Sequence, residues 1–195
     1  MFSRAALALL ALAALAAAAP APSVAARDTD HTTTDIAFDA SILAALEASF
    51  RDAAAASGVS ALASSTTRND VNSGLCADVI LIWARGTYGA GNIGAGVGTA
   101  FVDALAANEP GRTIVQGVQP YPALVVGYLA GGSPEGARAM AALTAKAAAQ
   151  CPGADIVWGG YSQGAQVAHL AAALVPGALH ARIKAVVVFG DCRRS

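Results

Sequence analysis

The sequence predicts an α/β protein, a three-layer α/β/α sandwich built on a mostly parallel, doubly wound sheet. Short apolar segments, each as long as a buried strand, alternate with longer segments of helical spacing, which is typical of parallel βαβ units. One apolar segment runs through Gly-Gly-Tyr-Ser-Gln-Gly directly into a helical segment. With 195 residues, the chain has the length of one domain with a sizeable core.

The N-terminal part is predicted to lie outside the folded domain. Arg4 precedes an unbroken apolar run from residue 5 to residue 19 that ends in small residues, the pattern of a secretory signal peptide. A run of about 15 residues is too short for a transmembrane helix, which needs roughly 20. We therefore expect a secreted, extracellular protein with a signal peptide at 1–19. Residues 20–65 are expected to be a propeptide or flexible segment with one possible helix at 41–56.

The folded domain is expected to cover residues 66–195, and it begins with an apolar, buried strand at 77–84. Ser133 and Pro134 mark the start of a long helix that ends near Gln150, because serine caps helices and proline fits their first turn. The segment around Pro120, Tyr121 and Pro122 is read as a loop. Further strands are predicted at 113–118, 154–159 and 183–189, and further helices at 92–107 and 163–174.

Residues 160–164 match the G-x-S-x-G pattern of a nucleophile elbow, with Ser162 at its centre. In such an elbow the serine occupies a strained strand-to-helix turn, and glycines on both sides leave room for the chain to double back. The N–H groups at the start of the following helix favour a developing oxyanion. A glycine-rich turn capped by serine is the alternative interpretation. The strand before Ser162 and the helix after it favour the elbow.

A second candidate element is the glycine-rich loop at 85–91, which follows the first strand. Sites in parallel sheets form outside the carboxyl ends of the strands, where both this loop and Ser162 are expected. An oxyanion hole needs the N–H of the residue after the nucleophile, here Gln163, and a second donor from a neighbouring loop. Gly86 and Thr87 are placed to supply that donor. The glycine spacing fits neither a dinucleotide-binding loop nor a P-loop.

The composition argues against several kinds of partner. The net charge of −1 gives no electrostatic case for binding nucleic acid or an anionic membrane. No metal and no cofactor is expected.

Cys76 and Cys151 each lie just before a predicted strand, positions compatible with a bridge between neighbouring strands. The third cysteine, Cys192, is then left alone.

These motifs resemble those of the cutinase family of secreted serine esterases, small α/β-hydrolases without a lid. The similar segments span about residues 66–191, and one departure is Tyr88-Gly89, where many members have Thr or Phe followed by Glu. The resemblance rests on Cys76-Ala77-Asp78-Val79-Ile80, Ala84-Arg85-Gly86-Thr87, Gly159-Gly160-Tyr161-Ser162-Gln163-Gly164 and Val188-Phe189-Gly190-Asp191.

The resemblance implies an activity and roles for individual residues. Ser162 is implied to be the nucleophile, Thr87 and Gln163 the oxyanion hole, and Cys76 the disulfide partner of Cys151. The implied activity is hydrolysis of cutin, related polyesters or short-chain esters through a serine acyl-enzyme, by a monomer without metal or cofactor. An acetylxylan esterase on the same scaffold is one alternative. A non-catalytic protein that binds polyester or polysaccharide is another.

The resemblance places the triad acid and histidine beyond the fourth strand, so we expect a cutinase-like domain that is missing its C-terminal part. His31 lies in the predicted N-terminal segment, and His180 falls at the opposite edge of the sheet from Ser162. His169 lies seven residues along the helix, roughly 10 Å of rise from the serine. Each is interpreted as a solvated or packing histidine. Asp191 is interpreted as a structural aspartate at a strand end, with no imidazole to orient.

Overall fold

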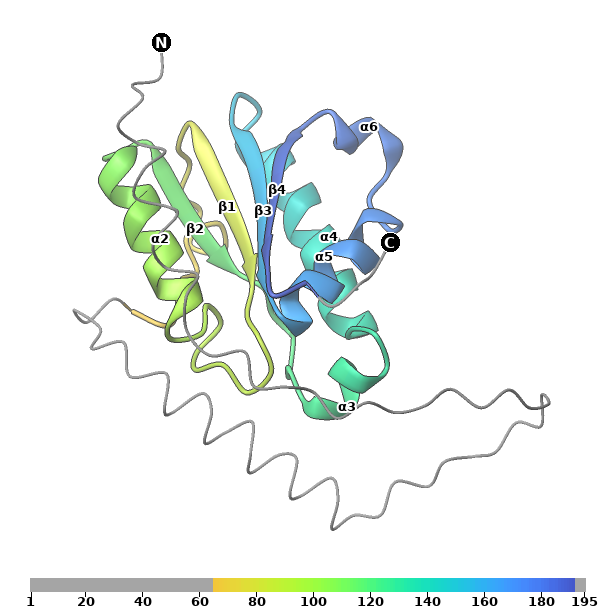
Figure 1. Cartoon of the computed structure of the whole chain (residues 1–195). Coiled ribbons are helices and arrows are strands. Elements are labelled where there is room, and N and C mark those ends of the chain that lie inside the picture. The colour runs from red at the N-terminus through yellow and green to blue at the C-terminus, as the bar shows by residue number, and fades with distance from the viewer. Residues whose placement is uncertain (1–64, 192–195) are drawn as a thin grey trace, which may run out of the picture. The chain divides into compact units, whose positions relative to one another are not determined.

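The computed structural model describes residues 65–191, which form a parallel four-stranded sheet with helices on both faces (Figure 1). The strand order is β2-β1-β3-β4, and every neighbouring pair is parallel. This arrangement confirms the predicted doubly wound α/β class. The strands are β1 (Val79–Ala84), β2 (Thr113–Gly117), β3 (Asp155–Tyr161) and β4 (Ile183–Phe189), and the helices are α2 (Val97–Asn108), α3 (Val125–Leu129), α4 (Pro134–Gln150), α5 (Gln163–Ala172) and α6 (Gly177–His180).

One of the two inner strands of the sheet is β1, whose sequence Val-Ile-Leu-Ile-Trp-Ala is apolar throughout. All of its residues after Val79 are buried, as expected for a parallel strand covered on both faces. Val79 lies opposite Thr113 of β2 on one side and Asp155 of β3 on the other. The carboxyl ends of these three strands therefore meet at one edge of the sheet, where a site is expected.

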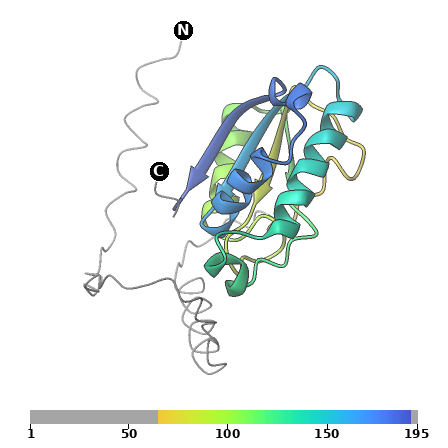
Figure 2. The same ribbon diagram turned by 90° about the vertical axis from the view of Figure 1, so that its right-hand side faces the viewer.

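Alternate residues of β1 belong to two separate cores, one on each face of the sheet. Leu81 and Trp83 face the α2 side, where the ring of Phe101 stacks on Trp83 with centroids 5.4 Å apart. Ile80 and Ile82 belong to the core on the other face, with Met140 of α4. Thus α2 covers one face while α4 and α5 cover the other, as Figures 1 and 2 show. These are the predicted three layers.

The helix α2 begins at Val97, so the predicted start near Asn92 is wrong. Asn92 is buried and holds the backbone of Arg68, accepting its N–H at 2.9 Å and donating to its carbonyl at 3.0 Å. Gly94 and Gly96 then adopt φ values of 81° and 76°, which do not continue into a right-handed helix. The short helices α3 and α6 lie in segments for which no helix was predicted, since so few residues give no periodic signal.

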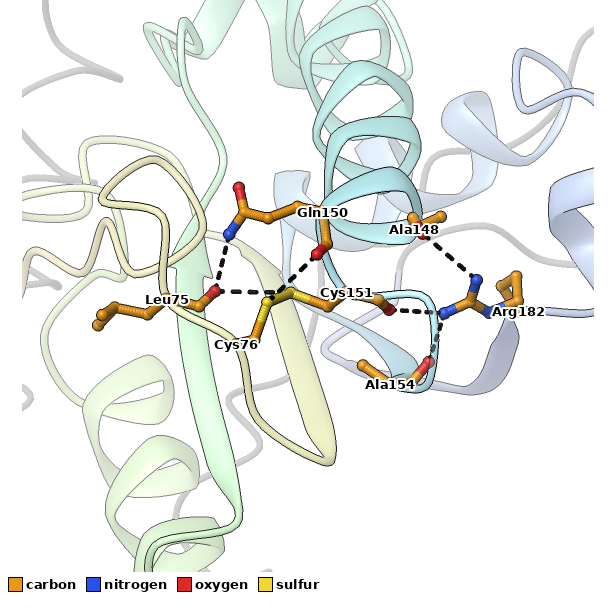
Figure 3. Close-up of a disulfide and its surroundings, with 7 residues drawn as sticks. All are labelled: Leu75, Cys76, Ala148, Gln150, Cys151, Ala154 and Arg182. Atoms are coloured by element: carbon orange, nitrogen blue, oxygen red, sulfur yellow. Dashed lines mark hydrogen bonds between the residues drawn. A yellow bond between two sulfur atoms is a disulfide. The ribbon is translucent and has the colours of Figure 1, made fainter.

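Cys76 and Cys151 form a disulfide, as predicted, with Cα atoms 5.7 Å apart (Figure 3). The bond joins the segment before β1 to the C-terminal end of α4. Beside it, Gln150 Nε2 donates a hydrogen bond of 2.8 Å to the carbonyl of Leu75. The two cysteines are 75 residues apart, so in the chain-entropy model the bond stabilises the fold by about 4 kcal/mol.

The guanidinium of Arg182 connects the C-terminal end of α4 to the start of β4 (Figure 3). It donates hydrogen bonds to the carbonyls of Ala148, Cys151 and Ala154 at 3.4, 3.0 and 2.8 Å. A cation at this position satisfies the last carbonyls of a helix and interacts favourably with the helix dipole. Arg182 immediately precedes β4, so these bonds hold the first residue of that strand against the main body.

The strand β4 lies at an edge of the described sheet and is more exposed than β1 or β3. Within residues 65–191 it pairs only with β3, and Val186 in its middle is 55% exposed. The predicted signal peptide, the possible helix at 41–56 and Cys192 fall outside the described residues. None of the helices within 65–191 combines the length and the apolar character that crossing a membrane requires.

Candidate active site

Ser162 lies at the junction between β3 and α5, at the carboxyl edge of the sheet. Its φ of 54° and ψ of −115° are unusual for a residue with a side chain, and they place the serine on a sharp strand-to-helix turn. The Ser162 N–H donates to the carbonyl of Phe189 at 2.9 Å, and its carbonyl accepts the Ala165 N–H at 2.9 Å. The end of β4 and the first turn of α5 thus hold the backbone of Ser162 in this strained conformation.

The two glycines of the elbow are required by close backbone contacts. A Cβ atom on Gly160 would lie 2.5 Å from the carbonyl oxygen of Gly164. A Cβ atom on Gly164 would overlap the carbonyl oxygen of Ala84, the last residue of β1. Glycine is therefore needed where the chain doubles back and where α5 passes over β1, as the sequence pattern predicted.

The loop that follows β1 lies directly beside the elbow. Ala84 pairs with Gly160 across the β1–β3 ladder, so the loop leaves the sheet next to Ser162. A Cβ on Gly86 would meet the ring of Tyr161 at 2.7 Å, so this loop packs closely against the residue before the serine. The hydroxyl oxygen of Thr87 is buried and has no hydrogen-bond partner among residues 65–191. A buried polar atom without a partner is unusual and is often a sign of function.

Gln163 is the first residue of α5, and its side chain is completely buried. Because the first N–H groups of a helix have no partner within that helix, the Gln163 N–H is available at this end of α5. Its side-chain Nε2 donates to the carbonyl of Leu124 at 2.7 Å, and its Oε1 accepts from the hydroxyl of Tyr121 at 3.0 Å. Both partners lie in the segment between β2 and α3, which therefore packs against the start of α5.

Arg85, the first residue of the loop after β1, is in contact with Tyr121. The guanidinium carbon of Arg85 lies 5.2 Å from the centre of the Tyr121 ring, in a cation–π contact. Burial lowers the pKa of Arg85, although its charged form is retained at neutral pH. Burial raises the pKa of Tyr121 well above its usual value, and the nearby Arg85 opposes this change only in part. The Tyr121 hydroxyl therefore keeps its proton over the whole physiological range.

Asp191 is in contact with a histidine side chain, whereas the sequence analysis expected no imidazole beside it. His169 Nε2 and Asp191 Oδ2 are 2.7 Å apart, so the pair joins α5 to the chain two residues beyond the end of β4. The side chain of His169 is 41% exposed and lies two turns from Ser162, so it is a solvated histidine as interpreted, with Asp191 as a partner that the sequence did not indicate. His180 ends α6, just before β4, and so lies at the opposite edge of the sheet from the serine, as predicted.

A protein-family model described as Cutinase matches residues 75–195 of the chain. The chain belongs to the cutinase family. Curated relatives include cutinase pbc1 of Pyrenopeziza brassicae and cutinase CUT1 of Coprinopsis cinerea, which are 45% identical to it over 117 and 133 residues. These matches cover 60% and 68% of this chain, but only 57% and 66% of the two relatives. The chain therefore spans less than two thirds of the length of these cutinases.

Solved structures of the same fold include a Trichoderma reesei cutinase in complex with a phosphonate inhibitor. It is 37% identical, with a TM-score of 0.61, and the match covers 78% of this chain and 65% of that one. An acetyl xylan esterase structure is 23% identical, with a TM-score of 0.50, and the match covers 60% of this chain and 64% of that one. At this identity the second likeness concerns the fold alone.

Sequence reasoning singled out Ser162, Thr87 and Gln163, and the structure brings the segments that carry them to one edge of the sheet. Sequence reasoning did not identify the role of Tyr121, which was read only as part of a loop between two prolines. The available signal was its place in the loop that leaves the carboxyl end of β2, at the same edge as the elbow. Which neighbour such a residue contacts depends on the path of the whole loop and is not encoded in local spacing.

Proposed function

We propose that the protein is a secreted carboxylic ester hydrolase of the cutinase type, with Ser162 as its nucleophile. The observation that carries the proposal is the φ of 54° at Ser162, on a strand-to-helix turn at the carboxyl edge of a parallel sheet. Ser162 Oγ bonds to the ester carbonyl carbon while its proton passes to a base, and the tetrahedral intermediate expels the protonated alcohol. Water then attacks the acyl-enzyme and releases the acid and the free serine.

The oxyanion in this proposal is bound by Gln163 and Thr87. Gln163 offers its N–H at the start of α5, where the helix dipole also favours negative charge. Thr87 offers its N–H and its hydroxyl, which is buried without a partner among the described residues. Donors that are fixed before the reaction stabilise the charge that develops on the ester oxygen, commonly by 10²–10³-fold in rate for a single donor.

The base in this proposal is a histidine outside residues 65–191. His169 is held by Asp191 and lies roughly 10 Å along the helix axis from Ser162, and His180 is at the opposite edge of the sheet. A serine hydroxyl without a base is a poor nucleophile at neutral pH. Residues 65–191 on their own therefore support only a slow esterase, slower by several orders of magnitude than a complete triad.

Exposed apolar side chains next to Gln163 support an apolar ester as the substrate. Leu124, whose carbonyl binds the Gln163 side chain, is 45% exposed, and Val126 is 62% exposed. Both also line a groove of about 370 Å³ between α3 and the start of α4. Such a surface suits cutin, another polyester or a short-chain ester better than it suits acetylated xylan, which presents mostly hydroxyl groups.

The proposed site of action is extracellular. The signal-peptide pattern at residues 1–19 supports secretion. The disulfide between Cys76 and Cys151 supports an oxidising compartment, because such bonds are rare in the reducing cytosol of most organisms.

Labelling with a p-nitrophenyl alkylphosphonate tests the nucleophile. The Ser162 Oγ–P bond forms as the P–O bond to p-nitrophenolate breaks, and the mass of the protein rises by one phosphonyl group. We expect one label on wild type, located at residue 162 by peptide mapping, and none on Ser162→Ala. A folded wild type that stays unlabelled while it still adsorbs to cutin would instead favour the non-catalytic binding protein.

Product release then tests the substrate class. We expect more acid from cutin or an aliphatic polyester than acetate from acetylated xylan, at equal protein concentration. A preference for acetylated xylan would replace the cutinase assignment by acetylxylan esterase while leaving the role of Ser162 in place.

A further inference from the structure

We propose that Tyr121 is a positioning residue that holds the two halves of the oxyanion hole at a fixed separation. This inference rests on the function proposed above, since it concerns the same hole. The donors of that hole come from two different segments, the loop after β1 and the start of α5. A single buried hydroxyl touches both segments.

The hydroxyl of Tyr121 lies 3.0 Å from Gln163 Oε1 and 3.1 Å from the carbonyl oxygen of Arg85. Both of these atoms are acceptors, whereas a tyrosine hydroxyl has one proton to donate. The orientation of the Gln163 amide follows from its other bond, because the Leu124 carbonyl can only accept from Nε2. Oε1 therefore faces Tyr121 and accepts, and the same proton is shared with Arg85 in a three-centre bond.

The segment that carries Tyr121 is attached to the loop at a second point. The N–H of Tyr88 donates to the carbonyl of Ala123 at 2.9 Å. Thr87 thus lies between two residues, Arg85 and Tyr88, that are both bonded to residues 121–123. Leu124, the next residue, accepts a hydrogen bond from the side chain of Gln163 through its carbonyl. The segment from Tyr121 to Leu124 is a brace between the Thr87 loop and the first residue of α5.

The ring of Tyr121 has little freedom to move within this brace. Only 3% of the residue is exposed, and a Cβ atom on Gly136 of α4 would lie 2.7 Å from its ring. The guanidinium of Arg85 covers the ring. Because oxyanion donors must lie about 2.7–3.1 Å from the oxyanion, a small shift of the Thr87 loop relative to Gln163 weakens the hole. Removal of the hydroxyl is therefore expected to slow the chemical step without changing how tightly the ligand binds.

The test compares Tyr121→Phe with wild type in the labelling reaction with a p-nitrophenyl alkylphosphonate, measured at several reagent concentrations. The first-order labelling constant is expected to fall by about tenfold, since displacements of an ångström or less can cost up to about a hundredfold in rate. The apparent dissociation constant of the reagent is expected to change by less than about twofold, because the ring and its packing are retained.

Thr144→Val is the matched control. It also removes a buried hydroxyl, one that accepts from Trp158 Nε1 at 2.9 Å and donates to the Met140 carbonyl at 2.8 Å, but it touches neither half of the hole. We expect its labelling constant to equal that of wild type. If Tyr121→Phe labels as fast as wild type, or if both variants slow equally, the positioning role is overturned.

Gln163→Met provides a second route if Tyr121→Phe does not fold, because it removes the other end of the same bond and keeps the backbone N–H. It is expected to slow labelling to a similar extent. Both changes break the bond between Tyr121 and Gln163, but Gln163→Met also removes the bond to Leu124 and Tyr121→Phe the bond to Arg85, so the loss in the double variant is expected to be less than the sum of the two single losses. Additive losses would contradict a shared bond. A folded wild type that takes no label overturns the proposed function itself, which is a separate outcome from equal labelling of wild type and variants.

Discussion

Gly164, in the first turn of α5, lies against the carbonyl oxygen of Ala84 so closely that no side chain fits between them. The contact joins the elbow helix to the end of β1, from which the Thr87 loop departs. The position of Ser162 relative to that loop is therefore set by backbone atoms, which adapt less than side chains do.

Gly164→Ala is predicted to damage the site and the fold together. The added methyl group must displace either α5 or the end of β1, and overpacking of this kind costs about 1–3 kcal/mol or more. A thermal melt should show a clearly lowered midpoint, and phosphonate labelling of Ser162 should slow. Gly153→Ala is the control, since a Cβ there meets nothing within 4 Å. Equal midpoints for the two variants would contradict the close contact.

Loss of the Cys76–Cys151 bond is predicted to destabilise the fold by about 4 kcal/mol, because the unfolded chain regains the freedom of a long loop. The free energy of unfolding of Cys76→Ser/Cys151→Ser, measured in urea, checks this value against wild type. Reduction of wild type should lower its stability to the level of the double variant. An unchanged urea midpoint would mean that the bond constrains nothing that unfolding releases.

Buried Tyr121 is predicted to make the protein sensitive to alkali. Burial raises its pKa in the folded state, whereas an unfolded tyrosine titrates near 10. Above about pH 10 the unfolded chain loses a proton that the folded protein keeps, so stability falls as pH rises, by at most about 1.4 kcal/mol per pH unit for this residue. Below pH 10 this contribution is fully present.

The stability of Tyr121→Phe, measured in urea between pH 8 and pH 11, checks that sign. Between these pH values, Tyr121→Phe is expected to lose less stability than wild type loses. Tyr161→Phe removes a hydroxyl from an exposed side chain, so its stability should depend on pH as that of wild type does. Parallel curves for wild type and Tyr121→Phe would show that the buried hydroxyl does not titrate differently in the two states.

The elements with strong local signals were predictable from the sequence. The strand at 183–189 and the start of the helix after Ser133 have the predicted bounds, because an apolar run and a cap are local features. The start of α2 was not predictable. It depends on Asn92 turning inward to bond with Arg68, a residue 24 positions away in the chain.

The candidate site also has one part that was predictable from the sequence and one part that was not. The elbow around Ser162 was predictable because glycine, serine and strand–helix context lie within one short stretch. The Tyr121 brace and the His169–Asp191 pair were not, because their partners are 42 and 22 residues apart and meet only through the sheet topology. The spacing of His169 from Ser162 excluded it as a base but gave no indication of its bond to Asp191.

His169→Ala is predicted to leave the reactivity of Ser162 unchanged. The imidazole lies two turns along α5 and is held by Asp191, so it is not placed to take the serine proton. Stability is expected to fall by no more than about 1 kcal/mol, because the side chains of the pair are 41% and 26% exposed and solvent screens their attraction. The phosphonate labelling rate and a thermal melt check both expectations. A loss of labelling by a hundredfold or more in a folded variant would make His169 the base.

The most direct test of Ser162 as nucleophile is to trap its acyl-enzyme. The full chain is mixed with p-nitrophenyl butyrate, quenched in acid within seconds to minutes, and digested for mass spectrometry. We predict one butyryl group on the peptide that contains residue 162, formed together with a burst of p-nitrophenol, and no such group in Ser162→Ala. A wild type that melts cooperatively yet carries no butyryl group there, or a Ser162→Ala variant that acylates as fast as wild type, would contradict the assignment.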